Sequence, residues 1–504
     1  MEAGFQARFL CRIEDCTLPT PFDALVIGGG VSGLSTAYFL RSELSSQGHQ
    51  PRPGLKLFEG AERLGGTLGS EEVEGFLFER GPNGMLDNAP GTLELITALG
   101  LDEKRFEARP RSLDRFLMRR GKLCPLPRSP RAFLSSSLLS LRGRLGLLLE
   151  PFRARGRSVA DESIAEFGRR RLGQEAVDVL LDPMVTGIYA GDVETLSMRS
   201  CFPRMSALER EHGSLVKGMI RSRKKKSAAG GGSSPFSATL QSFEGGLETF
   251  SRALGAEIGD RAETGRRAES VSPCAGGWRV SFADGAEEEA RALVLALPAY
   301  RAAKLFTESH PELGKELSSI SYSSVAVACL GYRQEDVERD LDGYGFLVPA
   351  SEGLQTLGMI WTSSIYPEHA PQGHVSIRAM LGGRRSPEVL GKTDEELMEL
   401  VERETGEVLG FRGAPVAHKI YRYEQAIPQY EVGHQARLES IDGLLSGLPG
   451  LFLTGNSYRG VSVNDCLHQG METAGRVSGY LGEVIPTASS APRPPDSDGL
   501  NKLS

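Results

Sequence analysis

Six residues near the N-terminus have the types and spacing of a dinucleotide-binding turn. Gly28, Gly30 and Gly33 form the pattern G-x-G-x-x-G, which follows an apolar run at 24–27 and precedes a helix-like run at 34–44. The first glycine permits a tight turn, the second lets a pyrophosphate approach the backbone, and the third lets helix and strand pack closely. Phosphates would accept hydrogen bonds from the N–H groups at the helix N-terminus. The flanking patterns therefore favour a dinucleotide site over a glycine-rich turn without a ligand.

A carboxylate suited to an adenosine ribose follows the second apolar run. Glu59 comes directly after residues 55–58 and could accept hydrogen bonds from both ribose hydroxyls. It arrives later than the usual ~20 residues, and the polar insertion at 45–54 accounts for the delay. Glu59 also opens the pattern E-x-x-x-R-x-G-G, which Arg63 and Gly66 complete. This pattern resembles the second signature of the flavin-containing amine oxidase superfamily and so predicts FAD rather than a nicotinamide cofactor.

Composition limits the classes of protein that the chain can be. With 504 residues, 40% hydrophobic and 24% charged, we expect a globular protein of two or three domains. The net charge of −7 argues against general nucleic-acid binding. The seven cysteines are scattered singly, which predicts reduced thiols, a cytoplasmic setting and no metal site. No apolar run is long enough for a transmembrane helix, and residues 1–20 fit a disordered leader better than a signal peptide.

One strongly basic region stands out in this acidic chain. Residues 104–157 hold fifteen basic and three acidic residues, a local net charge of +12. Within it, residues 133–149 have the pattern of an amphipathic helix with flanking arginines, typical of a helix in a membrane interface. A buried helix with a solvated basic face fits the same pattern, and periodicity alone does not separate the two. A second amphipathic helix is predicted at 158–182, where Asp182-Pro183 should end it.

Further along, ordered and low-complexity segments alternate. The basic, glycine-rich stretch 221–235 and the tail 486–504 are predicted to be disordered. Strands expected between 236 and 300 return the chain to the first domain, which is therefore discontinuous. Residues 301–440 look like a separate α+β unit. Near the C-terminus a strand, a glycine turn and a helix at 466–481 repeat the geometry of the opening motif, and this helix N-terminus could face the flavin ring.

Seven segments together resemble the oxygen-dependent protoporphyrinogen oxidase family, over roughly residues 22–483. The segments are the two opening patterns, Gly81-Pro82, and the stretches at 200–203, 324–327, 427–430 and 458–466. The resemblance implies an α/β plus α+β fold with three parts. These are a discontinuous Rossmann-type FAD-binding domain (20–89, 236–300 and 441–485), a helical membrane-binding domain (90–215) and a substrate-binding domain (301–440).

The resemblance also implies which residues contact the FAD. By motif, these are Gly28, Gly29, Gly30, Val31, Ser32, Gly33, Glu59, Arg63, Gly66, Thr67, Gly81, Pro82, Asn83, Gly84, Ala268, Asn456, Val461, Ser462 and Val463. No metal ligand and no catalytic side chain are expected, because a pyrrole N–H can itself lose the proton when the flavin removes a hydride.

The same resemblance implies a substrate site. Arg115 begins the stretch RFLMRRG, which fits the family's propionate-binding pattern, and a guanidinium offers a carboxylate a bidentate fork. A surface arginine is the alternative interpretation. Leu347, Ile360 and Met380 map to apolar residues that clamp the macrocycle, although plant-type members carry Phe at the Met380 position. The Gly187 carbonyl would accept from a pyrrole N–H.

The implied activity is the FAD- and oxygen-dependent, six-electron oxidation of protoporphyrinogen IX to protoporphyrin IX, with release of hydrogen peroxide. The implied partners are porphyrinogen, oxygen, a membrane surface touched peripherally, a second copy of the chain and ferrochelatase. Three alternatives stay open: coproporphyrinogen III oxidation, another oxidation of the superfamily such as that of amines or carotenoids, and a non-catalytic flavoprotein.

Overall fold

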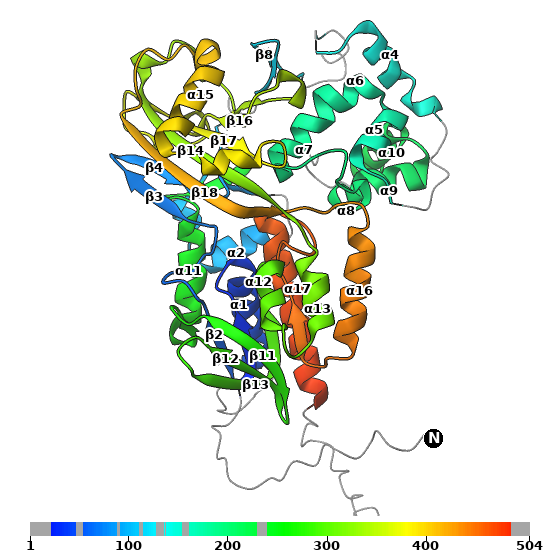
Figure 1. Cartoon of the computed structure of the whole chain (residues 1–504), viewed down its shortest axis with the longest axis vertical. Helices are drawn as coiled ribbons and strands as arrows, with labels where there is room; N and C mark the ends of the chain where they lie inside the picture. The colour runs from blue at the N-terminus through cyan, green and yellow to red at the C-terminus, as the bar shows by residue number, and fades with distance from the viewer. Residues whose placement is uncertain are drawn as a thin grey trace, which may run out of the picture.

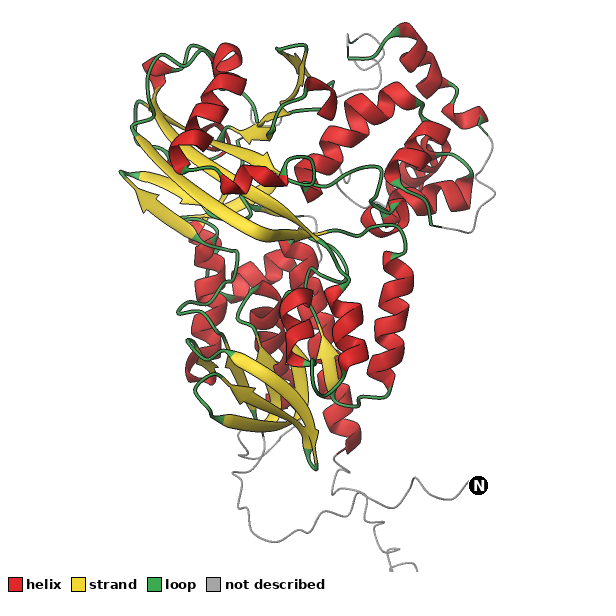
Figure 2. Ribbon diagram, viewed as in Figure 1, coloured by secondary structure: helices red, strands yellow, loops and turns green. Residues whose placement is uncertain are grey.

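The computed structural model has two seven-stranded sheets, two smaller sheets and a layer of helices (Figures 1 and 2). In the view of Figure 1 the first sheet and its helices fill the lower half, the second sheet lies at the upper left, and helices α4 to α10 lie at the upper right. The structure describes residues 22–46, 54–87, 91–109, 114–127, 136, 138–153, 161–228 and 239–484.

The first sheet is built from segments that lie far apart in the sequence. Its order is β10-β2-β1-β13-β12-β11, and β19 also pairs with β13. The neighbours of β1 are parallel, whereas β11, β12 and β13 pair antiparallel. The strands are β1 (Phe22–Ile27), β2 (Leu55–Phe58), β10 (Ala262–Glu263), β11 (Ala268–Cys274), β12 (Gly277–Phe282), β13 (Glu287–Leu295) and β19 (Leu451–Leu453). This is the discontinuous α/β arrangement that the sequence predicts.

Helices cover both faces of this sheet, because its central strands contain continuous buried apolar runs, at 24–27 in β1 and at 292–295 in β13. One face packs against α1 (Val31–Ser46), α11 (Glu248–Ile258) and α17 (Val463–Val484). The other face packs against α12 (Ala299–Leu305), α13 (Pro311–Ser318) and α16 (His434–Ser446). A Cβ on Gly470 would lie 2.0 Å from Ser35 Oγ, so α1 and α17 cross in close contact.

The second sheet has seven strands in the order β18-β14-β17-β16-β15-β7-β8. Helix α15 (Asp394–Leu409) covers one of its faces. The other face meets the hairpin of β3 (Ser70–Val73) and β4 (Phe76–Glu79). The strands are β7 (Arg115–Arg119), β8 (Lys122–Pro125), β14 (Tyr322–Arg333), β15 (Gly345–Leu347), β16 (Thr356–Ile360), β17 (His374–Gly382) and β18 (Ala417–Pro428).

The helical layer packs around a small apolar core and a buried ion pair. Its members are α4 (Leu141–Leu148), α5 (Ile164–Arg171), α6 (Gln174–Ala176), a π-helix (Val177–Leu181), α7 (Asp182–Tyr189), α8 (Met198–Cys201), α9 (Pro203–His212) and α10 (Leu215–Ala228). Arg171 and Glu150 pair in the interior, where 0% and 1% of the side chains are exposed. Among the helices of the described ranges, none has both the length and the apolarity needed to cross a membrane.

Three expectations about boundaries need correction. The region 90–215 is not helical throughout, because β7 and β8 belong to the second sheet and β6 (Arg105–Glu107) pairs with β9 (Leu240–Phe243). Strands β6 and β7 find partners more than a hundred residues away, which local patterns do not reveal. Helices α12, α13 and α16 pack on the first sheet although most of their residues fall within 301–440. Residues 221–228 continue helix α10, whereas 229–238 lie outside the described residues.

Two predicted helices also differ from what the sequence patterns suggest. Of the segment 158–182, the described residues 161–182 contain several short helices. Pro183 does not end a helix but lies in the first turn of α7, where its missing N–H is not needed. The helix expected at 133–149 begins only at Leu141, after Ser140 caps it by accepting from the Gly143 N–H. The described structure does not include residues 133–135 and 137, the leader 1–20 or the tail 486–504.

Candidate flavin and substrate site

Gly28 and Gly33, after β1, occupy positions that other residues could not fill, whereas Gly30 has space beside it. Gly28 has φ of 108° and donates its N–H to the Phe58 carbonyl at 2.8 Å. A Cβ on Gly33 would lie 1.9 Å from the Gly28 oxygen, so the third glycine is required for the turn itself. A Cβ on Gly30 would have only the Gly66 Cα within reach, at 4.0 Å. Gly30 therefore faces open space, as a residue beside a pyrophosphate must.

Glu59 and Arg63 shape the surroundings of this turn. The Glu59 carboxylate accepts from the N–H of Gly29 at 2.6 Å and from that of Ala61 at 2.8 Å. It thus lies beside the glycine turn, where the sequence places the ribose. The Arg63 guanidinium donates to three carbonyl oxygens of its own loop, including Gly66 at 2.6 Å. Arg63 therefore holds the second glycine loop against the first.

The segment 81–84 runs close to the second glycine loop. A Cβ on Gly81 would lie 2.1 Å from the Thr67 carbonyl oxygen, so Thr67 and Gly81 are in contact. Pro82 follows, and then Asn83, whose side chain is 7% exposed. Neither its amide nitrogen nor its oxygen has a hydrogen-bond partner within the described chain. A buried amide without partners is costly, so a ligand polar group is expected here.

The N-terminus of α17 is joined to that of α1. Ser462 and Asp465 cap α17 reciprocally, each backbone N–H donating to the other side chain at 3.1 Å. The Cys466 thiol contacts Ser32 and the backbone of Asn456, and burial raises the pKa of this thiol to about 11. The thiol is therefore neutral at physiological pH. The carbonyl of Asn456 accepts from Tyr430, and Val461 to Val463 lead into the helix.

Ala268 lies near the candidate ribose site. It begins β11, and the preceding chain runs along the Glu59 loop, where Arg266 N–H donates to the Glu59 carbonyl at 3.0 Å. The structure thus brings the predicted cofactor residues to one edge of the first sheet, between α1, the segment 81–84 and α17. An open glycine cradle, an unpartnered amide and two helix N-termini fit an FAD.

The predicted substrate residues share one face of the second sheet. Arg115, Gly345 and Ile360 lie in direct register on β7, β15 and β16. Leu347 and Met380 both lie opposite Gly358 in the next row. Because side chains two residues apart on a strand share a face, these side chains point the same way.

Gly187 meets this face from the helical layer. A Cβ on Gly187 would lie 2.8 Å from a Leu347 methyl, so α7 approaches the sheet closely here. Arg115 is exposed, and its guanidinium carbon lies 5.0 Å from the centre of the Tyr344 ring. The guanidinium is thus held over an aromatic ring at the end of the row.

Arg378 is a residue of this face that the sequence analysis missed. It follows Ile360 in the same register row, on β17. Its side chain is 5% exposed and donates to the Gly81 carbonyl, so it joins the substrate face to the segment 81–84. A charged residue inside the otherwise apolar strand VSIRAML was the signal that could have revealed it.

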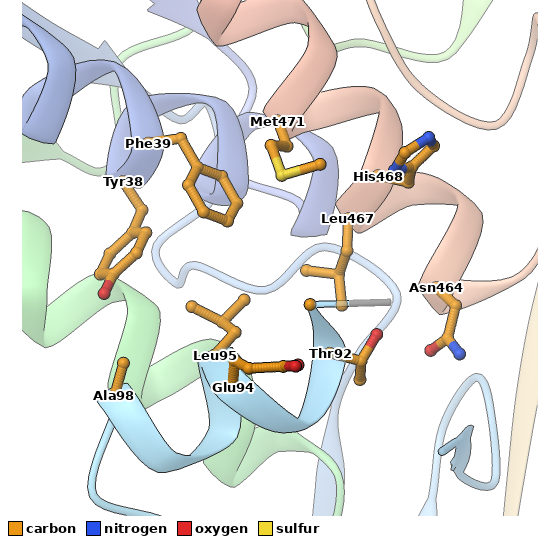
Figure 3. A pocket seen from close by; sticks show the side chains of 11 residues that line it. Tyr38, Phe39, Thr92, Glu94, Leu95, Ala98, Asn464, Leu467, His468 and Met471 are labelled. Atoms are coloured by element: carbon orange, nitrogen blue, oxygen red, sulfur yellow. The ribbon is translucent and has the colours of Figure 1, made fainter. Parts of the chain in front are cut away.

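The predicted site residues line neither of two further cavities, a pocket and a groove. Figure 3 shows Tyr38, Phe39, Leu95 and Met471 around a pocket of about 290 Å³ between α1, α17 and α2 (Thr92–Ala98). None of the predicted site residues lines it. A groove of about 930 Å³ runs between the β7–β8 hairpin and the helices α4 to α6. Within the described ranges, acidic, cysteine and histidine side chains form no cluster suited to a metal ion.

Comparisons with known proteins match this architecture. The profile of the family described as flavin containing amine oxidoreductase matches residues 31–478. A protoporphyrinogen oxidase of Bos taurus is 34% identical, over 90% of this chain and 98% of its own length. A coproporphyrinogen III oxidase of Bacillus subtilis is 28% identical, over 91% of this chain and 98% of its own length.

Among solved structures, a protein of Exiguobacterium sp. 255-15, provisionally assigned as a protoporphyrinogen oxidase, superposes with a TM-score of 0.76 at 25% identity. The superposition covers 91% of this chain and 99% of that one. The sequence match and the shared fold both extend across the two sheets and the helical layer. The chain therefore belongs to the flavin-containing amine oxidoreductase family, in the group that holds the protoporphyrinogen oxidases.

Proposed function

We propose that this protein oxidises a porphyrinogen to the corresponding porphyrin, with FAD as cofactor and oxygen as electron acceptor. The observation that carries the proposal is the substrate face of the second sheet. It presents Arg115 together with the apolar side chains of Leu347, Ile360 and Met380, and Arg378 joins it to the segment 81–84 beside the cofactor residues. A largely apolar macrocycle with acidic substituents is complementary to such a face.

The flavin supplies two-electron oxidation when bound, so three rounds remove six electrons and six protons and convert three O₂ to three H₂O₂. The chain's own residues bind and orient the macrocycle. Arg115 pairs with a propionate, and Leu347 and Met380 pack against the ring. The Gly187 carbonyl accepts from a pyrrole N–H and so fixes the ring's orientation. Positioning of this kind contributes to the rate by holding the reacting atoms in place.

Protoporphyrinogen IX is the first candidate substrate, because the sequence resemblance implies it, and coproporphyrinogen III is the second candidate. The two differ by vinyl groups in place of two propionates, so the number of cations at the site distinguishes them. The buried Arg378 is the observation that favours the second candidate.

The decisive experiment is aerobic turnover of the purified FAD-bound protein with each porphyrinogen, followed by porphyrin fluorescence and peroxide release. We expect three peroxides for each porphyrin formed. Protein stripped of FAD serves as the control and should show only the slow background oxidation by air. Failure to oxidise either porphyrinogen with FAD bound would contradict the proposal and direct attention to amines and carotenoids.

We also propose that the helical layer contacts a membrane peripherally. Five large apolar side chains on and after α4 are exposed: Leu141, Leu145, Leu148, Leu149 and Phe152, with Leu141 at 80% and Phe152 at 82%. Arg142 and Arg144 lie among them. Apolar side chains would enter the interface, and each nearby basic residue would add ~1 kcal/mol on an anionic surface.

Co-sedimentation with vesicles tests this contact. We expect the wild-type protein to bind vesicles that contain anionic lipid, and a Leu141→Ser/Phe152→Ser double variant to lose most of that binding. Leu93→Ser, which removes an apolar side chain exposed elsewhere at 39%, is the matched control and should bind normally. Equal binding by the double variant and the control would contradict the proposed surface.

The groove beside this apolar surface gives the macrocycle a route to the site. Leu145 and Leu149 line the groove, and its Leu117 and Val179 pack in the same cluster as Leu347. The groove therefore extends from the exposed apolar surface to side chains that pack against Leu347. We also propose that the protein forms a homodimer and that it transfers its porphyrin product to ferrochelatase. Analytical ultracentrifugation tests the first, and transfer kinetics with purified ferrochelatase test the second.

A further inference from the structure

Arg378 is buried without a carboxylate to balance its charge. Arg171 and Arg378 are the buried arginines of the described chain, at 0% and 5% exposure. Arg171 pairs with Glu150. Among the described residues the only hydrogen-bond partner of Arg378 is the neutral Gly81 carbonyl, and its buried Nε has none. A buried guanidinium without a counter-charge costs several kcal/mol, so an anion from outside the chain is expected to compensate it.

Glu79, the acidic side chain whose pKa the charge of Arg378 lowers, is already engaged elsewhere. Glu79 accepts from the Leu247 N–H at 2.7 Å and from the Ser70 hydroxyl at 2.8 Å. Burial raises the pKa of Glu79 to about 7, although the charge of Arg378 acts against that rise. Glu79 is therefore protonated in a large fraction of molecules near neutral pH and does not fully compensate Arg378.

One other polar group without a partner lies beside the segment 81–84. The Tyr366 hydroxyl is buried and unpartnered, and it lies 2.5 Å from where a Cβ on Gly84 would be. Arg378 reaches the same segment at the Gly81 carbonyl. A cation and a hydroxyl beside one backbone segment are donors that a carboxylate accepts from.

The sheet register sets the separation of the two cations. Arg115, Gly345, Ile360 and Arg378 occupy four neighbouring strands in one row. Three steps of the usual strand spacing place the Cα atoms of Arg115 and Arg378 about 14 Å apart. This span suits two carboxylates on opposite edges of one macrocycle better than two on neighbouring rings.

We propose that Arg378 forms a second carboxylate-binding subsite, opposite Arg115, which selects a porphyrinogen with carboxylates on both edges. The inference rests on the proposed function and narrows it. Coproporphyrinogen III carries a propionate on each of its four rings, whereas protoporphyrinogen IX carries its two on neighbouring rings. A macrocycle that binds Arg115 through one carboxylate can therefore reach Arg378 with a second only if it carries carboxylates on opposite edges, as coproporphyrinogen III does.

Binding of the oxidised products tests this subsite without turnover. Coproporphyrin III and protoporphyrin IX are titrated into the FAD-bound protein, and their affinities are measured from porphyrin fluorescence. We expect wild-type protein to prefer coproporphyrin III. Arg378→Met should weaken coproporphyrin III binding about tenfold or more and change protoporphyrin IX binding little. Arg378→Lys, which keeps the charge, should recover part of the loss.

Arg333→Met is the matched control, because this exposed arginine lies at the end of β14 in the same sheet. It should leave both affinities unchanged. Equal weakening of both porphyrins in Arg378→Met, or no preference in the wild type, would overturn the subsite. A shifted flavin midpoint potential with unchanged porphyrin affinities would overturn it too, because the charge would then act on the flavin. If the wild type oxidises neither porphyrinogen, the proposed function itself fails, independently of these affinities.

Discussion

The two buried arginines of the described chain, Arg171 and Arg378, lie in regions that compensate a buried positive charge in different ways. In the helical layer, Arg171 pairs with Glu150 and also donates to the carbonyls of Arg153 and Gly213. Glu150 in turn accepts from Ser214 at 2.6 Å, so this charge is compensated within the chain. On the substrate face, the only hydrogen-bond partner of Arg378 among the described residues is the carbonyl of Gly81. A completed network stabilises a fold, whereas an incomplete one marks a place where a ligand completes it.

The largest expected effect lies in the completed network. Arg171→Met leaves Glu150 buried without its ion-pair partner, and breaking a buried pair costs about 3–5 kcal/mol of the free energy of unfolding. Chemical denaturation followed by far-UV circular dichroism measures the loss. Glu194→Gln, which removes an exposed partner of Arg169, should have little effect. Comparable stabilities of the two variants would show that the buried network is not structural.

The next effect is on substrate binding. Arg115→Ala removes the cation that we assign to a propionate, and loss of a charged partner should weaken porphyrinogen binding by about 2–5 kcal/mol while FAD stays bound. Steady-state kinetics and the flavin absorbance measure the two properties. Lys122→Ala, on the neighbouring strand β8, is the control and should keep a normal KM. An unchanged KM in Arg115→Ala would remove this residue from the site.

Ionisation of the buried Glu79, which the charge of Arg378 influences, should make the stability of the protein depend on pH. Because burial raises the pKa of folded Glu79 from its ordinary value of 4.5 to about 7, the folded state holds the proton more tightly than the unfolded state. Stability is therefore lost as pH rises from about 4.5 to 7, by up to about 3 kcal/mol. Glu79→Gln should flatten this part of the stability–pH curve, whereas the exposed Glu72→Gln should not. Denaturation at several pH values would contradict the assignment if Glu79→Gln kept the wild-type slope.

The smallest expected effect is that of Gly30→Ala on FAD binding, and Gly33 provides the contrasting position in the same turn. Gly33 is closed in by the chain, so Gly33→Ala should fail to fold or lose much stability. Gly30 faces open space, so Gly30→Ala should fold normally and bind FAD about tenfold more weakly, a difference of about 1.4 kcal/mol. Thermal unfolding of the apoprotein and flavin titration separate the two effects. Normal FAD affinity in Gly30→Ala would argue against a pyrophosphate at this residue.

Local sequence patterns determined the cofactor side of this protein. The glycine turn, Glu59 and the paired glycines lie within forty residues of one another, and their roles follow from backbone geometry that neighbouring residues impose. The discontinuous first sheet was predictable for a similar reason, since its buried strands are continuous apolar runs. The order of the motifs along the chain pointed to the family.

Only the tertiary structure decided the substrate face. Arg115 and Arg378 are more than 250 residues apart in the sequence, and the pairing of four strands brings them into one row. No local pattern reports such pairing, because the partners of β7 and β17 are chosen by packing over the whole chain. Local periodicity likewise misplaced β7 and β8 in a helical region. The charge of Arg378 was visible in the sequence, but its burial beside Gly81 depended on contacts between distant segments.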